Sequence, residues 1–412
     1  MKKLIILGLA VLLAGVFWYD PDVLNWGRPA LQYTKNQVTT VEKDLPDVMI
    51  FTDLTRGSLT EFGREVPSVI RFFYEQLNEQ EQAVYDQLLT GLLLGATSIR
   101  VETVDTELVT TIFERILWDY PEIFWATGAA RQQLIIPFGE TGHILFMPEY
   151  SHERDEKIVL QALIDERVNA FLATVATEVS EFELVLAVYE YLILTTTYNL
   201  DADDHQNIVS VFVHGQSVCA GISRAAQLLL NQLGIFAIYV VGDAFVGSSP
   251  EPLPHAWNLV RVADNYYHLD VTWGIPNFAD DDGAVGQISI LYDYFLVNDN
   301  LIATTHQRRA GKVIPAATSL ANNFFVVNKM FYELVDEAQL LAVLQASIAA
   351  DDDAVTFKFA DDVLFAAAQT LLLDELVFAA ARPRALELGL TQIQFRFRPK
   401  ANLNMITIYW VW

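Results

Sequence analysis

Apolar and polar positions follow one another along the chain in a pattern that predicts both helices and strands. Residues 98–102 alternate with the period of a strand, and Asp105 is placed to cap a following helix that reaches about Trp118. Apolar residues recur at helical spacing over 75–94, 153–176 and 181–194. After Ala321 strands are expected at 355–359, 392–398 and 405–409, and a helix at 363–373. The pattern predicts an α+β protein.

The first residues carry the pattern of an export signal. Lys2 and Lys3 precede an uncharged, mostly apolar run from Leu4 to Tyr19. This run falls between a signal-peptide core and the roughly 20 residues of a comfortable membrane-spanning helix. We therefore expect residues 1–19 to be a signal peptide or an uncleaved signal anchor, with the body of the protein extracellular or at the cell surface.

Changes in composition divide the remainder of the chain. Prolines and polar residues mark 20–45 as a spacer. We expect an N-terminal mixed α/β domain at 46–150, a core at 151–315 and a C-terminal mixed α/β domain at 320–412. No segment after the N-terminal run reaches the length of a transmembrane helix without charges.

Charge and cysteine content narrow the classes of function. The 412 residues include 26 Lys and Arg against 52 Asp and Glu, a formal charge of −26. Nucleic acid is excluded as a partner, because affinity for phosphates comes mostly from basic side chains. Membrane contact is expected only through the N-terminal segment. Cys219 is the single cysteine, which excludes an intramolecular disulfide framework and a cysteine-based zinc site.

Cys219 begins a stretch of helical spacing that ends at Gly234. Its apolar residues fall on one face: Ile222, Ala225, Ala226, Leu229, Leu230 and Leu233. A thiol at the first turn of a helix lies beside unpaired N–H groups and the positive end of the helix dipole, and both stabilise a thiolate. Cys219 is therefore a candidate nucleophile, although a lone cysteine is more often a small buried apolar residue.

Two alternating stretches on either side of an Asp-Asn pair predict a β-hairpin that carries His255 and Asp270. If Asp264 and Asn265 form a two-residue loop, Asp270 lies opposite Leu259, on the same face as His255. The two would still be separated by roughly 13 Å along the strand. Contact between them then requires a wider loop, a bulge or strong twist.

A cysteine nucleophile needs a base that holds it as a thiolate and an acid for the leaving amine, and a histidine serves as both. A carboxylate fixes the tautomer of that histidine. The motifs Gln216–Gly221, His255–Asn258 and Asp270–Trp273 resemble, in order and with spacings of 36 and 15 residues, those of the transglutaminase-like superfamily. The resemblance covers about 181–294, and the flanking segments are similar to those of exported bacterial members.

The resemblance implies a papain-like α+β core with small mixed flanking domains. It implies Cys219 as nucleophile, His255 as base and acid, and Asp270 as the residue that orients His255. The Cys219 N–H would belong to the oxyanion hole, and Tyr198 is a candidate side-chain donor. Val218 stands where animal crosslinking enzymes have glutamine, so we prefer an amide hydrolase, acting on proteins or cell-wall peptides through a thioester, over a crosslinking enzyme.

Two other classes of function stay open. A non-catalytic surface binding or scaffold module could retain the same fold, and it would have no need of a reactive Cys219. A metal-dependent hydrolase is poorly supported, because the seven histidines show no ligand-like spacing and the acidic clusters lack the spacing of a calcium loop. No cofactor or metal is expected, and the oligomeric state is not readable from the sequence.

Overall fold

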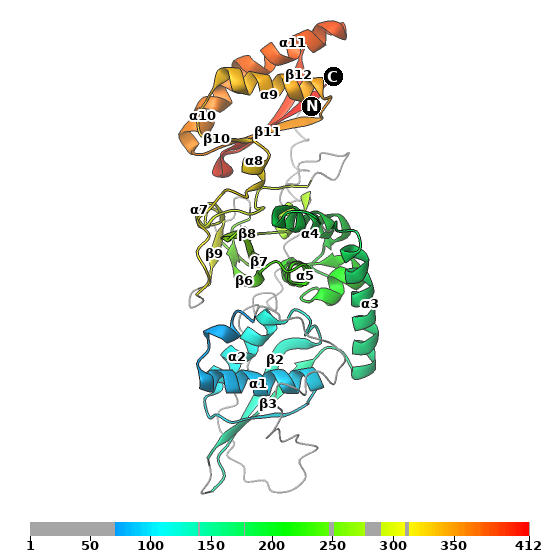
Figure 1. Cartoon of the computed structure of the whole chain (residues 1–412), viewed down its shortest axis with the longest axis vertical. Helices are drawn as coiled ribbons and strands as arrows, with labels where there is room; N and C mark the ends of the chain where they lie inside the picture. The colour runs from blue at the N-terminus through cyan, green and yellow to red at the C-terminus, as the bar shows by residue number, and fades with distance from the viewer. Residues whose placement is uncertain are drawn as a thin grey trace, which may run out of the picture.

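The computed structural model describes residues 71–138, 141–176, 178–246, 251–276, 290–309 and 313–411. The predicted export segment at 1–19 and spacer at 20–45 lie outside these residues. Helices and strands alternate along the described chain, as expected for an α+β protein. Three sheet-containing parts follow one another along the long axis of the molecule (Figure 1).

The N-terminal part packs helices on a three-stranded antiparallel sheet of order β1-β3-β2. The predicted Asp105 cap is confirmed, because its side chain accepts the Leu108 N–H at 2.9 Å. Asn78 and Glu81 form a capping box at the start of the first helix. The elements are η3 (Tyr74–Gln76), α1 (Glu79–Leu94), β1 (Ile99–Val101), α2 (Thr106–Asp119), β2 (Ala126–Ile135) and β3 (His143–Tyr150).

The middle part combines helices with a four-stranded antiparallel sheet of order β8-β7-β6-β9. Its helices are α3 (Arg154–Leu172), α4 (Glu181–Thr195), the π-helix η4 (Ser210–His214), α5 (Cys219–Gln232), η5 (Thr272–Gly274) and α7 (Asp299–Ile302). Its strands are β4 (Thr197–Tyr198), β5 (Gln216–Ser217), β6 (Ala237–Ala244), β7 (Leu253–Val262), β8 (Asn265–Leu269) and β9 (His306–Arg308). The helix predicted to begin at Cys219 is therefore present.

The C-terminal part has a second four-stranded sheet, of order β10-β11-β13-β12. Its strands are β10 (Phe331–Tyr332), β11 (Ala354–Phe359), β12 (Gln394–Lys400) and β13 (Met405–Val411). Its helices are α8 (Phe324–Val327), α9 (Glu337–Ala349), α10 (Asp362–Leu371), η6 (Leu372–Leu376), α11 (Val377–Glu387) and η7 (Ala401–Leu403). The sequence pattern predicted the three longer strands and α10, but not α9 or α11.

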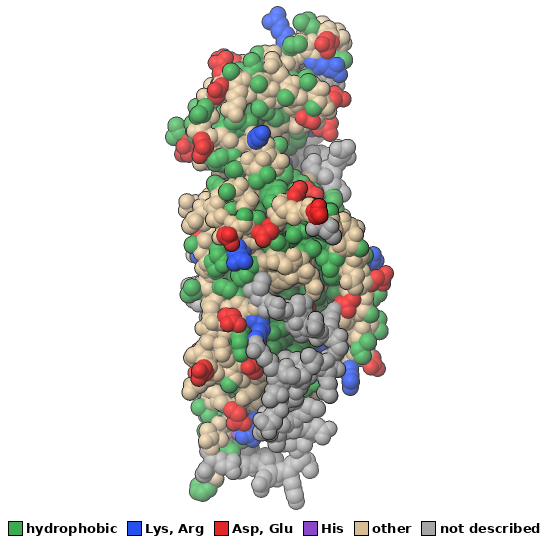
Figure 2. All heavy atoms as spheres, in the orientation of Figure 1, with side chains coloured by type: hydrophobic (Ala, Val, Ile, Leu, Met, Phe, Trp, Pro, Cys, Tyr) green, Lys and Arg blue, Asp and Glu red, His purple; other side chains and the backbone are tan. Residues whose placement is uncertain are grey.

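Within the described residues, the continuous helical stretch Asp362–Glu387 has the length and apolar composition of a membrane span. It is also the helical layer of the C-terminal sheet, since Phe365, Leu372 and Val377 belong to that sheet's buried core. Its apolar character is therefore explained at least in part by packing. Acidic and basic side chains are scattered over the face of the molecule shown in Figure 2.

The N-terminal part and the nucleophile helix share one hydrophobic core. A single cluster of buried residues runs from Leu77 in the N-terminal part to Leu229 in α5 and Leu296 beyond the sheet. Two hydrogen bonds reinforce it: Arg224 donates to the Leu117 carbonyl at 2.9 Å and Gln227 to the Trp118 carbonyl at 2.8 Å. These carbonyls lie in the last turn of α2, where helical partners are missing. The boundary at 150/151 stays a prediction, and packing is continuous across it.

Gly242 lets the centre of the middle sheet close tightly. It lies on β6 opposite His255 on one side and Arg308 on the other. A Cβ atom at this position would stand 2.3 Å from the Gln307 carbonyl oxygen and 2.7 Å from Cη2 of Trp257. The missing side chain therefore makes room for the Trp257 ring between β7 and β9.

Gly242→Ala is expected to lower the free energy of unfolding by about 1–3 kcal/mol, because backbone or a fully buried indole has to shift. Urea denaturation followed by circular dichroism measures the change. Gln307→Ala, at an exposed neighbouring side chain, is the control that should leave stability within about 0.5 kcal/mol. Unchanged stability of Gly242→Ala would contradict the close packing at Gly242.

Candidate active site

Cys219 is the first residue of α5, as the sequence predicted. Its N-cap, Val218, provides no side-chain hydrogen bond, so the first-turn N–H groups receive no cap from it. The turn fits tightly against the preceding loop, since a Cβ atom at Gly221 would lie 2.8 Å from the Asn207 carbonyl oxygen and 2.9 Å from that of His205. This packing fixes the place of the thiol, whose residue is 3% exposed.

The hairpin that carries His255 and Asp270 forms, but with a register different from the predicted one. Val262 pairs with Asn265, so the loop residues are Ala263 and Asp264 and not Asp264 and Asn265. Both loop residues have positive φ, 47° and 66°, as a type I′ turn requires. Leu259 therefore pairs with His268 and not with Asp270.

The observed register explains how His255 and Asp270 meet. The same register continued by one residue places Asp270 level with Trp257, which shares a face with His255 and lies only about 7 Å further along the strand. The chain then leaves the sheet into η5. His255 Nε2 and Asp270 Oδ2 are 2.6 Å apart, and the predicted separation of roughly 13 Å was wrong.

His255 and Asp270 form a charged pair in a buried place. Burial alone lowers the pKa of His255, but the charges of Asp270 and Cys219 and hydrogen bonds to both outweigh it and raise the pKa to about 10. For Asp270, burial acts to raise the pKa, and contacts with His255 and His306 hold it well below its usual range. At neutral pH the pair is an imidazolium and a carboxylate.

Cys219 lies within hydrogen-bonding reach of His255. Its thiol acts on His255 as a charge and as a hydrogen-bond partner. Because Asp270 holds Nε2, Nδ1 is the ring nitrogen left for the thiol. Cys219 also contributes, after burial, to raising the pKa of Tyr198 and of Tyr239. The structure thus gathers the predicted residues Cys219, His255 and Asp270 in one place, with the candidate donor Tyr198 near them, and their catalytic roles stay predictions.

A second histidine on the same carboxylate was not predicted. His306 Nε2 lies 2.9 Å from Asp270 Oδ2, and the backbone N–H of Trp273 donates to Oδ1 at 3.2 Å. His306 begins β9, which pairs with β6 on the side away from β7. It belongs to no motif and lies 36 residues after Asp270, so the strand pairing of the sheet is what reveals it.

His268 holds the Trp257 ring that packs against His255. A histidine on a strand beside a hairpin turn is by default partly exposed, but His268 is fully buried on β8. Its Nδ1 lies 2.9 Å from the indole Nε1 of Trp257, and its Nε2 lies 2.9 Å from Asp299 Oδ1. Since the indole can only donate, His268 is neutral with its proton on Nε2. The Trp257 ring fixed in this way stacks on His255, with centroids 6.1 Å apart.

His255, Asp270 and His306 could offer three ligand atoms to a metal ion, all within 4.8 Å of one another. Both imidazole nitrogens, however, contact the same carboxylate oxygen at 2.6 and 2.9 Å. These are hydrogen-bond distances, shorter than the spacing of two ligands around one zinc ion with bonds of about 2.0–2.1 Å. The cluster is built to hold protons.

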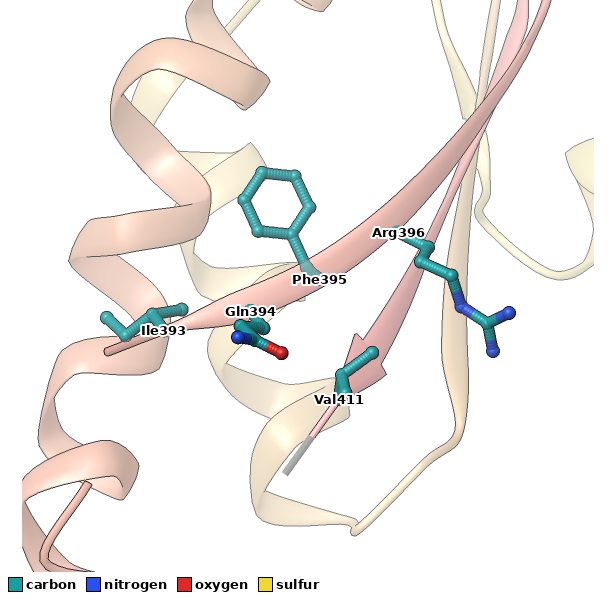
Figure 3. Close-up of a pocket in the computed structure, with 5 residues that line it drawn as sticks. All are labelled: Ile393, Gln394, Phe395, Arg396 and Val411. Atoms are coloured by element: carbon teal, nitrogen blue, oxygen red, sulfur yellow. The ribbon is translucent and has the colours of Figure 1, made fainter. Parts of the chain in front are cut away.

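A depression on the surface lies elsewhere. It has a volume of about 520 Å³ and is lined by Ile393, Gln394, Phe395, Arg396 and Val411 (Figure 3). These residues lie on and beside β12 and β13 of the C-terminal sheet. None of the candidate catalytic residues contributes to it.

Residues 169–271, which contain all three candidate residues, match the family described as the transglutaminase-like superfamily. This segment is similar to a transglutaminase-like domain. The α+β organisation around it is that of a papain-like core, as predicted. No curated protein matches the chain.

Solved structures show weaker likenesses to the chain. A TGase crystal structure has 17% identity and a TM-score of 0.26, and the match covers 46% of this chain and 54% of that one. A candidate cysteine protease from Cytophaga hutchinsonii has 15% identity, a TM-score of 0.24 and coverages of 43% and 69%. A crystal structure of menin that reveals the binding site for the Mixed Lineage Leukemia (MLL) protein has 15% identity and a TM-score of 0.22. That match covers 57% of this chain and 52% of menin. The chain spans about half the length of the TGase and of menin.

Asp270→Asn is expected to lower the pKa of His255 by about 1–3 units, because the carboxylate charge that opposes burial is lost. Histidine C2–H resonances followed by NMR against pH measure it. Asp204→Asn, which alters a carboxylate bonded to His152 and not to His255, is the control and should leave the pKa of His255 unchanged. A wild-type His255 that titrates near 6.5 would contradict the charged pair.

Proposed function

We propose that this protein is an exported cysteine-dependent enzyme that cleaves amide bonds of proteins or cell-wall peptides through a thioester. The observation that carries the proposal is the His255–Asp270 contact of 2.6 Å beside the thiol at the start of α5. A buried imidazolium held by a carboxylate favours a thiolate next to it. The match of 169–271 to the transglutaminase-like superfamily supports the same chemistry.

In the proposed cycle, Cys219 and His255 each act once in each half. The Cys219 thiolate attacks the amide carbon, the C–S bond forms, and first-turn N–H groups of α5 stabilise the oxyanion. The C–N bond then breaks as His255 Nδ1 gives its proton to the leaving amine. In the second half, neutral Nδ1 takes a proton from water, the hydroxide attacks the thioester, and the C–S bond breaks to give the acid and the thiolate.

Hydrolysis is preferred over transfer to an amine on sequence grounds. Val218 occupies the position that carries glutamine in animal crosslinking enzymes. An amine that reached the thioester before water would give a crosslink by the same steps. Incubation with a peptide library, with and without a primary amine donor, separates the two outcomes by the mass of the product.

A non-catalytic binding or scaffold module is the alternative, and the closed state of the site favours it. Cys219 and His255 are each only 3% exposed, so a substrate reaches them only after a local movement. A scaffold would keep the fold without needing either access or a reactive thiol. Reactivity of Cys219 distinguishes these functions.

Alkylation of Cys219 by iodoacetamide at pH 6 is expected to depend on His255, whose imidazolium favours the thiolate. His255→Ala should reduce the rate at pH 6 by about 10-fold or more, because the imidazolium that favours the thiolate is removed. Mass spectrometry measures the rate, and the sole thiol makes Cys219 the only cysteine that can react.

His214→Ala is the matched control, since this exposed histidine lies near the nucleophile loop and its alkylation profile should equal that of the wild type. Wild-type Cys219 that is inert throughout, or that reacts as a free thiol does regardless of His255, would favour the binding module instead.

Export is proposed from residues 1–19 alone. Lys2 and Lys3 before an apolar run favour a body that lies outside the cytoplasm, anchored by this segment or released from it. Fractionation of an expressing cell is expected to recover the protein from the membrane or the medium and not from the cytoplasm. The mass of the purified protein then shows whether residues 1–19 are retained. Recovery of the full-length protein only in the cytoplasm would contradict export.

A further inference from the structure

Asp270 is bound by two histidines, and the transglutaminase-like motifs account for only one of them. Oδ2 is 2.6 Å from His255 Nε2 and 2.9 Å from His306 Nε2. The side chains of Asp270 and His306 are completely buried, and that of His255 is 4% exposed. One carboxylate charge in such a place balances one imidazolium, so the second imidazole has to be neutral.

The hydrogen bonds around His306 fix which nitrogen carries its proton. Its Nδ1 lies 2.8 Å from Thr305 Oγ1, which in turn lies 2.7 Å from the Tyr294 hydroxyl. A carboxylate can only accept, so the proton is on Nε2 and Nδ1 accepts from Thr305. Thr305 then accepts from Tyr294. The chain runs in one direction, from Tyr294 through Thr305 and His306 to Asp270.

His306 is also held from its sides. The rings of Trp257, Trp273 and Tyr294 pack around it with centroid distances of 5.2, 4.8 and 5.1 Å. Burial is the main cause that lowers the pKa of His306, and the charge of His255 lowers it further. The titratable groups that face the His255–His306 cluster are Cys219 from α5, Tyr198 from β4, Tyr189 from α4, His268 from β8, Asp270 and Tyr294.

We propose that His306 is a positioning residue that acts through Asp270. Its permanently neutral imidazole donates Nε2–H to the carboxylate, so that His306 and His255 share the negative charge of Asp270. This rests on the proposed function. The need for it arises when His255 gives its Nδ1 proton to the leaving amine. Asp270 then loses its cationic partner inside the protein, and a buried carboxylate without donors is costly.

The His306 N–H remains in place through both halves of the cycle. It therefore stabilises the carboxylate when His255 is neutral and competes with His255 for Asp270 Oδ2 when His255 is cationic. Both effects make the His255 proton easier to release. His306 thereby lowers the pKa of His255, which favours its action as an acid. Trp257 and Asp270 set the orientation of the His255 ring.

The test is the titration of His255 in proteins with labelled histidine. In the wild type, His306 is expected to show the Nε2–H tautomer in long-range 1H–15N spectra from pH 5 to 9. His306→Phe fills the space without a donor and should raise the pKa of His255 by about one unit. His306→Gln, whose amide can donate at the same place, should return it to within about 0.3 units of the wild type.

A purely structural His306 would change the melting temperature in both variants and leave the pKa of His255 where it was. That result, or an equal shift in His306→Phe and His306→Gln, overturns the proposal. If His306→Phe does not fold, Thr305→Val removes the donor to Nδ1 and should give a smaller upward shift of the same sign. No shift in that variant overturns it as well.

Failure of the proposed function is recognised separately. If wild-type His255 titrates near 6.5 and Cys219 alkylates as a free thiol, the Cys219–His255 pair is absent and both proposals are overturned. If wild-type His255 titrates at alkaline pH and Cys219 reacts at acidic pH, while His306→Phe changes neither, only the role of His306 is overturned.

Discussion

The arrangement depends on one buried negative charge, the carboxylate of Asp270. It is completely buried and yet ionised, which is tolerable only because three donors surround it: His255, His306 and the Trp273 N–H. The donors come from three different segments, β7, β9 and η5. Because a buried carboxylate needs all of these donors, the middle sheet and the turn at η5 are stabilised together. The nucleophile helix meets the sheet next to His255, the cationic member of that cluster.

Small backbone features decide whether these donors can converge. The type I′ turn at Ala263 and Asp264 sets the register that brings Asp270 near His255. Gly242 leaves the space in which the Trp257 ring bridges from β7 toward His306 on β9. The indole is then anchored by neutral His268, which is itself held by Asp299. Orientation of one imidazole is thus distributed over a network whose members are far apart in the sequence.

The sequence predicted those parts of the site that depend on local pattern. The helix start at Cys219 and the hairpin follow from periodicity and turn chemistry, whereas the grouping of Cys219 with His255 and Asp270 came from the resemblance to the transglutaminase-like superfamily. The loop position was wrong by one residue, because an Asp-Asn pair signals a turn without saying which residues take positive φ. His306 and the burial of His268 could not be predicted, since both depend on which strands pair at distance. In the C-terminal part, α9 was missed because its apolar residues have no strong one-sided periodicity.

The anchoring of α5 has a consequence for how the chain can vary. Arg224 and Gln227 reach backbone carbonyls at the end of α2, not side chains. A substitution at Leu117 or Trp118 leaves these acceptors in place as long as the helix ends where it does, whereas any loss of Arg224 or Gln227 removes a donor outright. These two hydrogen bonds therefore constrain the two partners differently. The nucleophile helix has to keep Arg224 and Gln227, whereas the N-terminal part has to keep only the backbone path of α2.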